Sequence, residues 1–112
     1  MDCLFCKIVS GDIPSKKLYE DDKILAFYDI SPQAPIHFLV IPKKHIESCA
    51  ALTQENSDIV ADIFAKISDI TKKLGLNDGY RVVTNCGESA GQTVLHLHFH
   101  VLGGRLLSWP PG

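Results

Sequence analysis

The sequence predicts a single α+β domain: an antiparallel sheet, one long helix on a face of that sheet and a short N-terminal helix. Three observations support this fold class. The chain has 112 residues, the size of one compact domain, so residues 1–112 are treated as one domain. Its apolar residues fall in short runs separated by Pro, Gly and Asp, as in strands joined by turns. One segment carries a long apolar stripe at helical spacing.

The N-terminal half predicts a short helix and then three strands. Residues 3–10 have the length of one or two helical turns, which Gly11 is suited to end and Pro14 prevents from continuing. Asp21-Asp22-Lys23 is typical of a turn, and the proline-rich segment 31–35 of a loop. The predicted strands cover residues 18–20, 24–29 and 37–41.

The C-terminal half predicts the long helix and two further strands. The helix is expected from Thr53, as its N-cap, to Leu74, with Gly75 ending it. Its apolar stripe consists of Ile59, Ile63, Ile67 and Ile70, joined by Val60, Phe64 and Leu74. The predicted strands cover residues 80–84 and 93–102, separated by a loop over residues 85–92 and followed by an irregular tail over residues 108–112.

Composition narrows the class of partner and the compartment. The formal net charge is -2, so we expect no nucleic-acid and no membrane partner, although backbone donors can still hold one phosphate. Apolar runs stay short of the roughly 20 residues of a membrane span, and the N-terminus has no secretory signal pattern. We therefore expect a cytoplasmic protein whose four cysteines, Cys3, Cys6, Cys49 and Cys86, are reduced thiols.

Three of the five histidines fall at alternate positions of the last predicted strand. Because side chains alternate across a strand, His96, His98 and His100 are expected on one face. Leu95, Leu97, Phe99 and Val101 are expected on the core face. A solvated strand face has little need of three imidazoles, so this pattern indicates a functional site.

Two kinds of chemistry fit three neighbouring imidazoles. In one, they bind a metal, since three protein ligands and a water make a catalytic zinc site. In the other, one neutral imidazole attacks phosphorus and its neighbours orient it and hold the phosphate. The preceding Gly91-Gln92-Thr93 segment favours the second, because it offers a hydroxyl and backbone donors to phosphoryl oxygens rather than further metal ligands.

The segment His96 to Leu102 matches the His-φ-His-φ-His-φ-φ motif of the histidine triad (HIT) superfamily. Residues 31–45, and the ending formed by residues 101–105 and 109–112, resemble the corresponding parts of its Hint branch, the nucleoside phosphoramidate hydrolases. The likeness extends over essentially the whole chain. It implies a HIT-like fold, in which two chains join their sheets into a ten-stranded homodimer.

The resemblance implies a division of labour among the catalytic residues. His98 is the nucleophile, and attacks the α-phosphorus of a nucleoside 5′-phosphoramidate to form a nucleotidyl-histidine intermediate. His100 contacts the phosphate and His37 supports the triad. Thr93, a serine in many relatives, keeps the hydroxyl that contacts the phosphate or the leaving group. The implied catalytic set is His98, His100, His37, His96 and Thr93.

The same resemblance implies a purine nucleotide site, with nucleoside monophosphates and phosphoramidates as ligands. Asp29 matches an acidic residue that binds the ribose hydroxyls. The apolar residues around the base would be Leu4, Phe5, Ile8, Phe27 and Ile30. The phosphate end would be formed by Asn85, Gly91, Gln92, Thr93, His98 and His100.

No cofactor is required for catalysis under this interpretation, but a structural zinc is compatible with the chain. Cys3 and Cys6 have C-x₂-C spacing, which alone is weak evidence for a metal. Some bacterial relatives complete such a site with histidines at the positions of His45 and His96. The alternative is that the two cysteines are small buried apolar residues in a short helix.

Three other functions remain open from the sequence. One is a non-catalytic nucleotide-binding or interaction module. Another is hydrolysis of dinucleoside polyphosphates, which relatives with the same triad carry out. The third is a zinc hydrolase that uses the triad as metal ligands.

Overall fold

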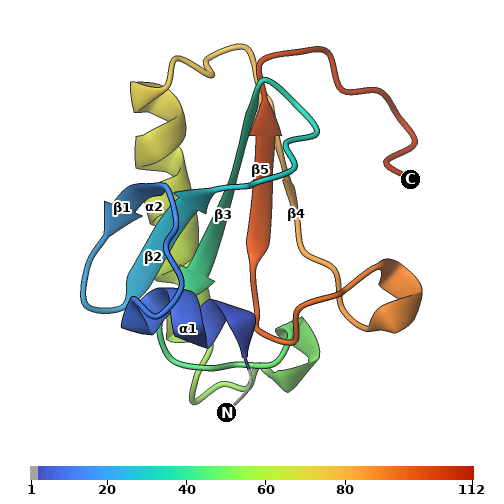
Figure 1. Ribbon diagram of the computed structural model, residues 1–112. Helices are drawn as coiled ribbons and strands as arrows, with labels where there is room; N and C mark the ends of the chain where they lie inside the picture. Colours follow the sequence, from blue (N-terminus) through green and yellow to red (C-terminus); the bar gives the residue numbers. More distant parts are fainter. Residues whose placement is uncertain (1–2) are drawn as a thin grey trace.

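Five strands form a single antiparallel sheet in the order β1-β2-β3-β5-β4 in the computed structural model, which describes residues 3–112 (Figure 1). The long strand β3 lies at the centre and pairs with β2 on one side and β5 on the other. The strands are β1 (Lys17–Glu20), β2 (Ile24–Tyr28), β3 (Ile36–Pro42), β4 (Tyr80–Val83) and β5 (Phe99–Gly103). The predicted α+β fold class is confirmed.

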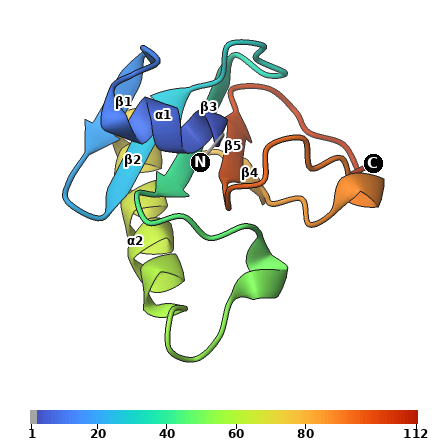
Figure 2. The ribbon, with the colours of Figure 1, turned by 60° about the horizontal axis from the view of Figure 1, so that its bottom comes forward.

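Helices cover both faces of the sheet, so its central strands are buried on both sides (Figures 1 and 2). The long helix α2 (Asp58–Lys73) packs Ile63 and Ile67 against one face, in a cluster with Phe38 and Val101. The short helix α1 (Leu4–Ser10) packs against the other face. Its cluster is Phe5 and Ile8 with Leu25, Phe27, Leu39 and Ile41.

Helix α2 begins later than its apolar stripe predicts. Thr53 is not its N-cap: the helix begins at Asp58 with Ser57 in the cap position, and residues 54–57 form turns in which the Thr53 carbonyl accepts from the N–H groups of Asn56 and Ser57. The Asn56 side chain in turn accepts from the Thr53 N–H, and such local bonds compete with helix formation. The predicted C-terminus is confirmed: Gly75 follows the helix with φ of 76° and donates to the Lys72 carbonyl.

Strand β5 is shorter than predicted, because its ladder with β3 begins only at Phe99. Residues 93–98 form an irregular approach to the strand, in which the Leu97 N–H donates to the Ile46 carbonyl. Alternation of side chains nevertheless persists, so Leu97 and Val101 lie in the α2 cluster. Leu95 does not join that cluster and is 55% exposed, which corrects its assignment to the core face.

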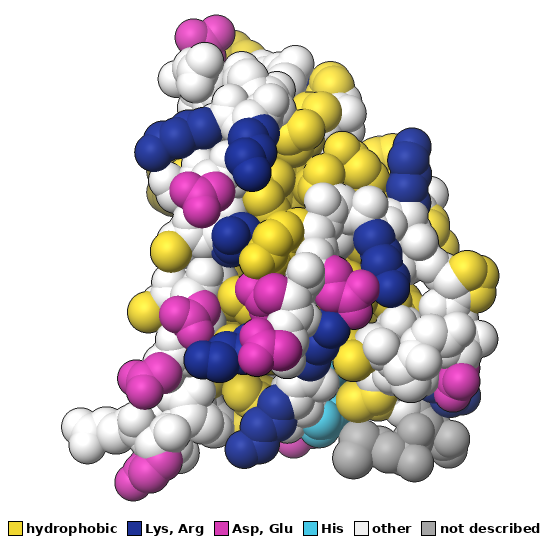
Figure 3. Space-filling model, turned by 90° about the vertical axis from the view of Figure 1, so that its left-hand side faces the viewer, with side chains coloured by type: hydrophobic (Ala, Val, Ile, Leu, Met, Phe, Trp, Pro, Cys, Tyr) yellow, Lys and Arg dark blue, Asp and Glu magenta, His cyan; other side chains and the backbone are white. Residues whose placement is uncertain are grey.

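The surface over β1 and α2 mixes charges of both signs with apolar side chains and shows no basic patch (Figure 3). Lys23 and Asp62, and Lys66 and Asp69, are pairs on this side. Within residues 3–112, neither helix is long and apolar enough to cross a membrane. Two short 3₁₀ turns, η1 (Cys49–Ala51) and η2 (Glu88–Ala90), lie in the loops that flank the candidate site.

Candidate active site

A cavity of about 670 Å³ opens on the α1 side of the sheet and reaches from α1 to the loop after β4. It brings together residues from four separate parts of the chain. The residues predicted to bind a nucleotide that line it are Leu4, Phe5, Ile8, Phe27, Asp29, Ile30, Asn85, Gly91, Thr93, His98 and His100. The cavity therefore unites all of that predicted set except Gln92.

One end of the cavity is apolar. Phe5, Ile8 and Phe27 are buried, whereas Leu4 is 44% and Ile30 is 99% exposed, so those two form its rim. The Phe5 ring meets Phe27 edge-on at a centroid distance of 5.6 Å. It also meets the ring of His98 at 5.1 Å and 90°. Phe5 thus separates the apolar end from the histidines and fixes the plane of the His98 ring.

His98 is held as one tautomer by the backbone. Its ring is buried, and its Nδ1 lies 2.7 Å from the carbonyl oxygen of His96. Because a carbonyl can only accept, Nδ1 carries the proton and Nε2 keeps its lone pair. The Thr84 hydroxyl donates to the His98 carbonyl at 2.8 Å and fixes the backbone at the same residue. A buried imidazole with a free Nε2 lone pair facing a cavity is suited to nucleophilic attack.

His37 and His100 form a directional relay. The Gln33 N–H donates to His37 Nδ1 at 3.1 Å, so the proton of neutral His37 lies on Nε2. That Nε2–H donates to His100 Nδ1 at 2.9 Å, which leaves the His100 proton on Nε2. Asp29 Oδ2 lies 3.4 Å from His37 Nε2. The relay therefore turns His100 into a hydrogen-bond donor at the cavity.

Burial keeps these relay histidines neutral. Burial lowers the pKa of His37, against the opposing effect of the Asp29 carboxylate. Burial, and then the nearby rings of His98 and His37, lower the pKa of His100 to about 4. Both relay rings are therefore uncharged near pH 7, as the hydrogen-bond directions require.

The loop before His98 is shaped by Gln92, which points away from the cavity. The Gln92 side chain is buried, accepts from the Gly87 N–H at 2.9 Å and donates to the Glu47 carbonyl at 2.8 Å. The Gln92 side chain therefore does not line the phosphate end of the cavity, where it was predicted to lie. By bracing this loop, Gln92 allows Gly91, with φ of 92°, and exposed Thr93 to line the cavity.

Three positions missed by the sequence analysis support the histidines. Thr84 holds the His98 carbonyl, and Gln33 sets the tautomer of His37. Arg105 donates to the Gln33 carbonyl from Nε at 3.3 Å and from Nη2 at 3.0 Å. The contacts of Thr84 and Arg105 join segments distant in sequence, and the Gln33 contact lies within a proline-rich loop that shows no regular spacing, so no local pattern marks these residues. The pairing of β5 with β3 and β4 brings Arg105 to Gln33 and Thr84 to His98.

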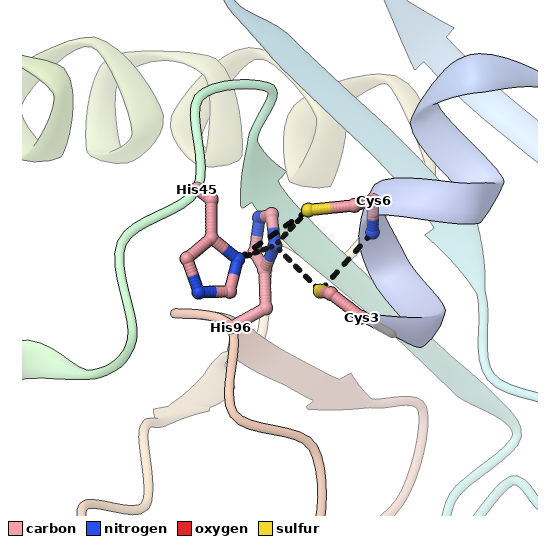
Figure 4. A group of neighbouring side chains, drawn as sticks. All are labelled: Cys3, Cys6, His45 and His96. Atoms are coloured by element: carbon pink, nitrogen blue, oxygen red, sulfur yellow. Dashed lines mark hydrogen bonds between the residues drawn. The ribbon is translucent and has the colours of Figure 1, made fainter. Parts of the chain in front are cut away.

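Cys3, Cys6, His45 and His96 converge on one point beside the cavity (Figure 4). The two cysteines come from the start of α1, His45 from the loop after β3, and His96 from the segment before β5. Cys3 Sγ lies 3.3 Å from His96 Nδ1, and Cys6 Sγ lies 3.3 Å from His45 Nδ1. The two Nδ1 atoms are 3.2 Å apart.

This donor set fits a tetrahedral zinc ion. Bonds of about 2.3 Å to sulfur and 2.0–2.1 Å to nitrogen place tetrahedral ligand atoms about 3.3–3.8 Å apart, close to the spacings observed. His96 Nε2 donates to the Pro42 carbonyl at 2.8 Å, which leaves its Nδ1 lone pair directed at the sulfurs. The residues present therefore suit the metal that the sequence analysis considered.

Fold and site define an α+β protein whose central sheet presents a histidine-lined cavity, and the family comparisons agree. The model of the HIT domain family matches residues 10–107. An uncharacterized HIT-like protein of Synechocystis is 47% identical over 99% of this chain and 97% of its own. The chain belongs to the HIT domain family.

Solved structures support the same assignment. The crystal structure of a HIT family hydrolase from Legionella pneumophila superposes with a TM-score of 0.97 at 47% identity, covering 99% of this chain and 100% of that one. A histidine triad protein from Clostridium difficile gives a TM-score of 0.93 at 50% identity, covering 96% and 95%. The protein is thus similar over its full fold to HIT family hydrolases.

Proposed function

We propose that the protein hydrolyses the P–N bond of purine nucleoside 5′-phosphoramidates, as in the Hint branch of the family. One observation supports this proposal above the others. His98, held with its proton on Nδ1 by the His96 carbonyl, presents a lone pair on Nε2 beside a cavity that has an apolar end and a donor-rich end.

The proposed reaction has two displacements at phosphorus. His98 Nε2 attacks the α-phosphorus and forms a P–N bond, while the bond to the amine breaks and the amine leaves with a proton. Water then attacks the same phosphorus, restores the free imidazole and releases the nucleoside monophosphate. Neither step needs a metal or an oxidant.

Other residues of the cavity stabilise the charge on the phosphoryl group. The relay directs the Nε2–H of His100 toward the cavity, where it would donate to a non-bridging oxygen. Thr93 and Asn85 line the same end with donors. Because the relay is neutral, His100 can accept at Nδ1 from His37 and still donate from Nε2 to the phosphoryl oxygen.

The base and the ribose are proposed to bind at the apolar end of the cavity and beside Asp29. Asp29 lines it, and its carboxylate has lone pairs for ribose hydroxyls beyond the bond that Oδ1 accepts from the Ser31 N–H. Phe5, Ile8 and Phe27 offer an apolar surface to the base. Such packing gives affinity with modest discrimination between purines.

The proposal is tested with a fluorogenic adenosine 5′-phosphoramidate. We expect turnover by the native protein and a loss of at least about a thousandfold in His98→Ala. Lys73→Gln, an exposed change at the end of α2 on the opposite face, serves as the control and keeps full activity. Intact mass after rapid quenching should show nucleotidylated protein, with the adduct mapped to His98.

The alternatives give different results in the same assay. Tight binding of AMP without phosphoramidate turnover would replace the proposal with a nucleotide-binding module. Turnover of a dinucleoside polyphosphate alone would replace it with that hydrolase class. Activity that disappears on metal removal and returns with zinc would favour a zinc hydrolase.

We further infer a structural zinc held by Cys3, Cys6, His45 and His96. When bound, it would tie the start of α1, and therefore Phe5, to the segment that carries His98. We also infer a homodimer that joins two sheets through β4, which is an edge strand. Both inferences concern assembly of the cavity rather than the chemical steps.

A further inference from the structure

Two cysteines lie outside both the cavity and the metal-ligand cluster. Cys49 begins the 3₁₀ turn η1, and Cys86 follows the cavity residue Asn85 at the start of the loop after β4. Cys86 is exposed and Cys49 is partly buried, and both are free thiols. They are far apart in sequence, and neither has a role in the proposed hydrolysis.

The structure brings these two thiols together around Ser48. Cys86 Sγ donates to the Ser48 Oγ at 3.5 Å, and that oxygen also accepts from the Ala50 N–H at 3.2 Å. Cys49 directly follows Ser48 in the chain, so its side chain leaves the backbone next to this Cys86–Ser48 contact. Ser48 is buried, so this cluster is a fixed feature of the fold rather than a chance surface approach.

Their surroundings give the two thiols different reactivity. The Ser48 hydroxyl, which can turn to donate to the Cys86 thiolate, and then the Ala50 N–H, lower the pKa of Cys86. Burial, and then the contact with Cys86, raise the pKa of Cys49. The exposed thiol is therefore the better nucleophile toward an oxidant, and the partly buried thiol is placed to react with it afterwards.

We propose that Cys49 and Cys86 form a reversible disulfide when a peroxide oxidises the protein. The Cys86 thiolate attacks one oxygen of hydrogen peroxide, which breaks the O–O bond and gives a sulfenic acid and hydroxide. The Cys49 thiol then attacks that sulfur, forms the S–S bond and releases water. Two thiols are oxidised and one peroxide is reduced to two waters.

The disulfide would join two segments that Gln92 already holds together. The Gln92 side chain accepts from the Gly87 N–H and donates to the Glu47 carbonyl. Gly87 is the residue after Cys86, and Glu47 is two residues before Cys49. A disulfide there would join the same two segments that the Gln92 hydrogen bonds already join. It would therefore restrain the loop that carries Asn85 and Gly91, and neither cysteine lines the cavity. This proposal does not depend on the hydrolase activity.

The test is a peptide map of the native protein after brief treatment with hydrogen peroxide. Trypsin cleaves after Lys44, Lys66, Arg81 and Arg105, so Cys49 and Cys86 fall in peptides 45–66 and 82–105, while Cys3 and Cys6 fall in peptide 1–7. We expect a linked 45–66/82–105 species, loss of two free thiols per chain, and full reversal by dithiothreitol.

Two variants assign the order of the steps. In Cys49→Ser the reaction should stop at a Cys86 sulfenic acid, trapped by dimedone. In Cys86→Ser, Cys49 should remain reduced under the same conditions. The proposal is overturned if the linked peptide is absent, if the link joins two chains on a non-reducing gel, or if Cys49 is oxidised equally fast without Cys86.

Discussion

The histidines of the two sites differ in which ring nitrogen keeps its lone pair. Backbone carbonyls bind Nδ1 of His98 but Nε2 of His96, so His98 presents Nε2 to the cavity and His96 presents Nδ1 to the cysteines. His100 accepts at Nδ1 from His37 and therefore donates from Nε2. Their hydrogen-bond partners alone thus suit three similar side chains to the three roles proposed for them, nucleophile, donor and metal ligand.

Because His100 is partly buried in its neutral form, the free energy of unfolding depends on pH. Its pKa is about 4 in the folded chain, against about 6.5 when unfolded, so between these values the unfolded chain binds more protons. Stability therefore falls as the pH is lowered through this window. We expect urea unfolding to show a loss of about 2 kcal/mol between pH 7 and pH 5 from this group. The free energy of unfolding of His100→Asn should fall less between pH 7 and pH 5. An equal fall in the variant and the native protein would contradict the lowered pKa of His100.

At the scale of elements, the loop between β2 and β3 is anchored to the segment that follows β5. Arg105 donates twice to the Gln33 carbonyl, and the Gln33 N–H sets the His37 tautomer. We expect Arg105→Ala to lower kcat/KM about fivefold, corresponding to about 1 kcal/mol. Arg81→Ala, which removes a similar bond to the Ser108 carbonyl, is the matched control. An equal effect of both variants would show that the loop contact is unimportant.

The proposed zinc would hold the start of α1 through Cys3 and Cys6, and metal removal tests this. We expect about one zinc per chain in purified protein, and a melting temperature lowered by several degrees in Cys6→Ser or after chelation. Because zinc takes no part in the steps at His98, kcat should change by less than about tenfold. Cys86→Ser should retain its zinc. A chelated protein of unchanged stability would contradict a structural ion.

Local patterns predicted the elements better than their ends. The apolar stripe of α2 and the glycine after it are local, and both were confirmed except at Phe64, which is 45% exposed and lies outside the core cluster. The start of α2 and the start of β5 were wrong, because turns around Asn56 and the contact of Leu97 with Ile46 override the periodicity there. Such contacts are made in three dimensions and leave no repeat in the sequence.

Within the candidate site, too, local patterns predicted some residues and missed those placed by contacts between distant segments. Alternation correctly placed His98 and His100 on one side of the chain, with ring centroids 5.1 Å apart. The inward turn of Gln92 and the contributions of Thr84 and Arg105 were not predicted, since each depends on which strands pair. The family resemblance supplied roles for the remaining cavity residues, and these roles stay predictions.

At the scale of the whole molecule, the two edges of the sheet are unlike. Edge strand β1 carries Lys17 and Glu20, whose ion pair at 2.8 Å discourages further strand pairing. Edge strand β4 begins with the 41% exposed Tyr80, and Arg81 ties the C-terminal tail beside it. Trp109 of that tail is 80% exposed. The β4 edge therefore offers unpaired backbone and apolar side chains to a second copy.

We expect sedimentation at micromolar concentration to give twice the chain mass of 12.3 kDa. A charge on the joining edge opposes close strand pairing, so Tyr80→Glu should shift the protein toward monomer, and Trp109→Ala should weaken the dimer. Lys17→Gln on the β1 edge should leave the mass unchanged. A native protein that sediments as a monomer would overturn the dimer. Dissociation by Lys17→Gln but not by Tyr80→Glu would instead place the interface at the opposite edge of the sheet.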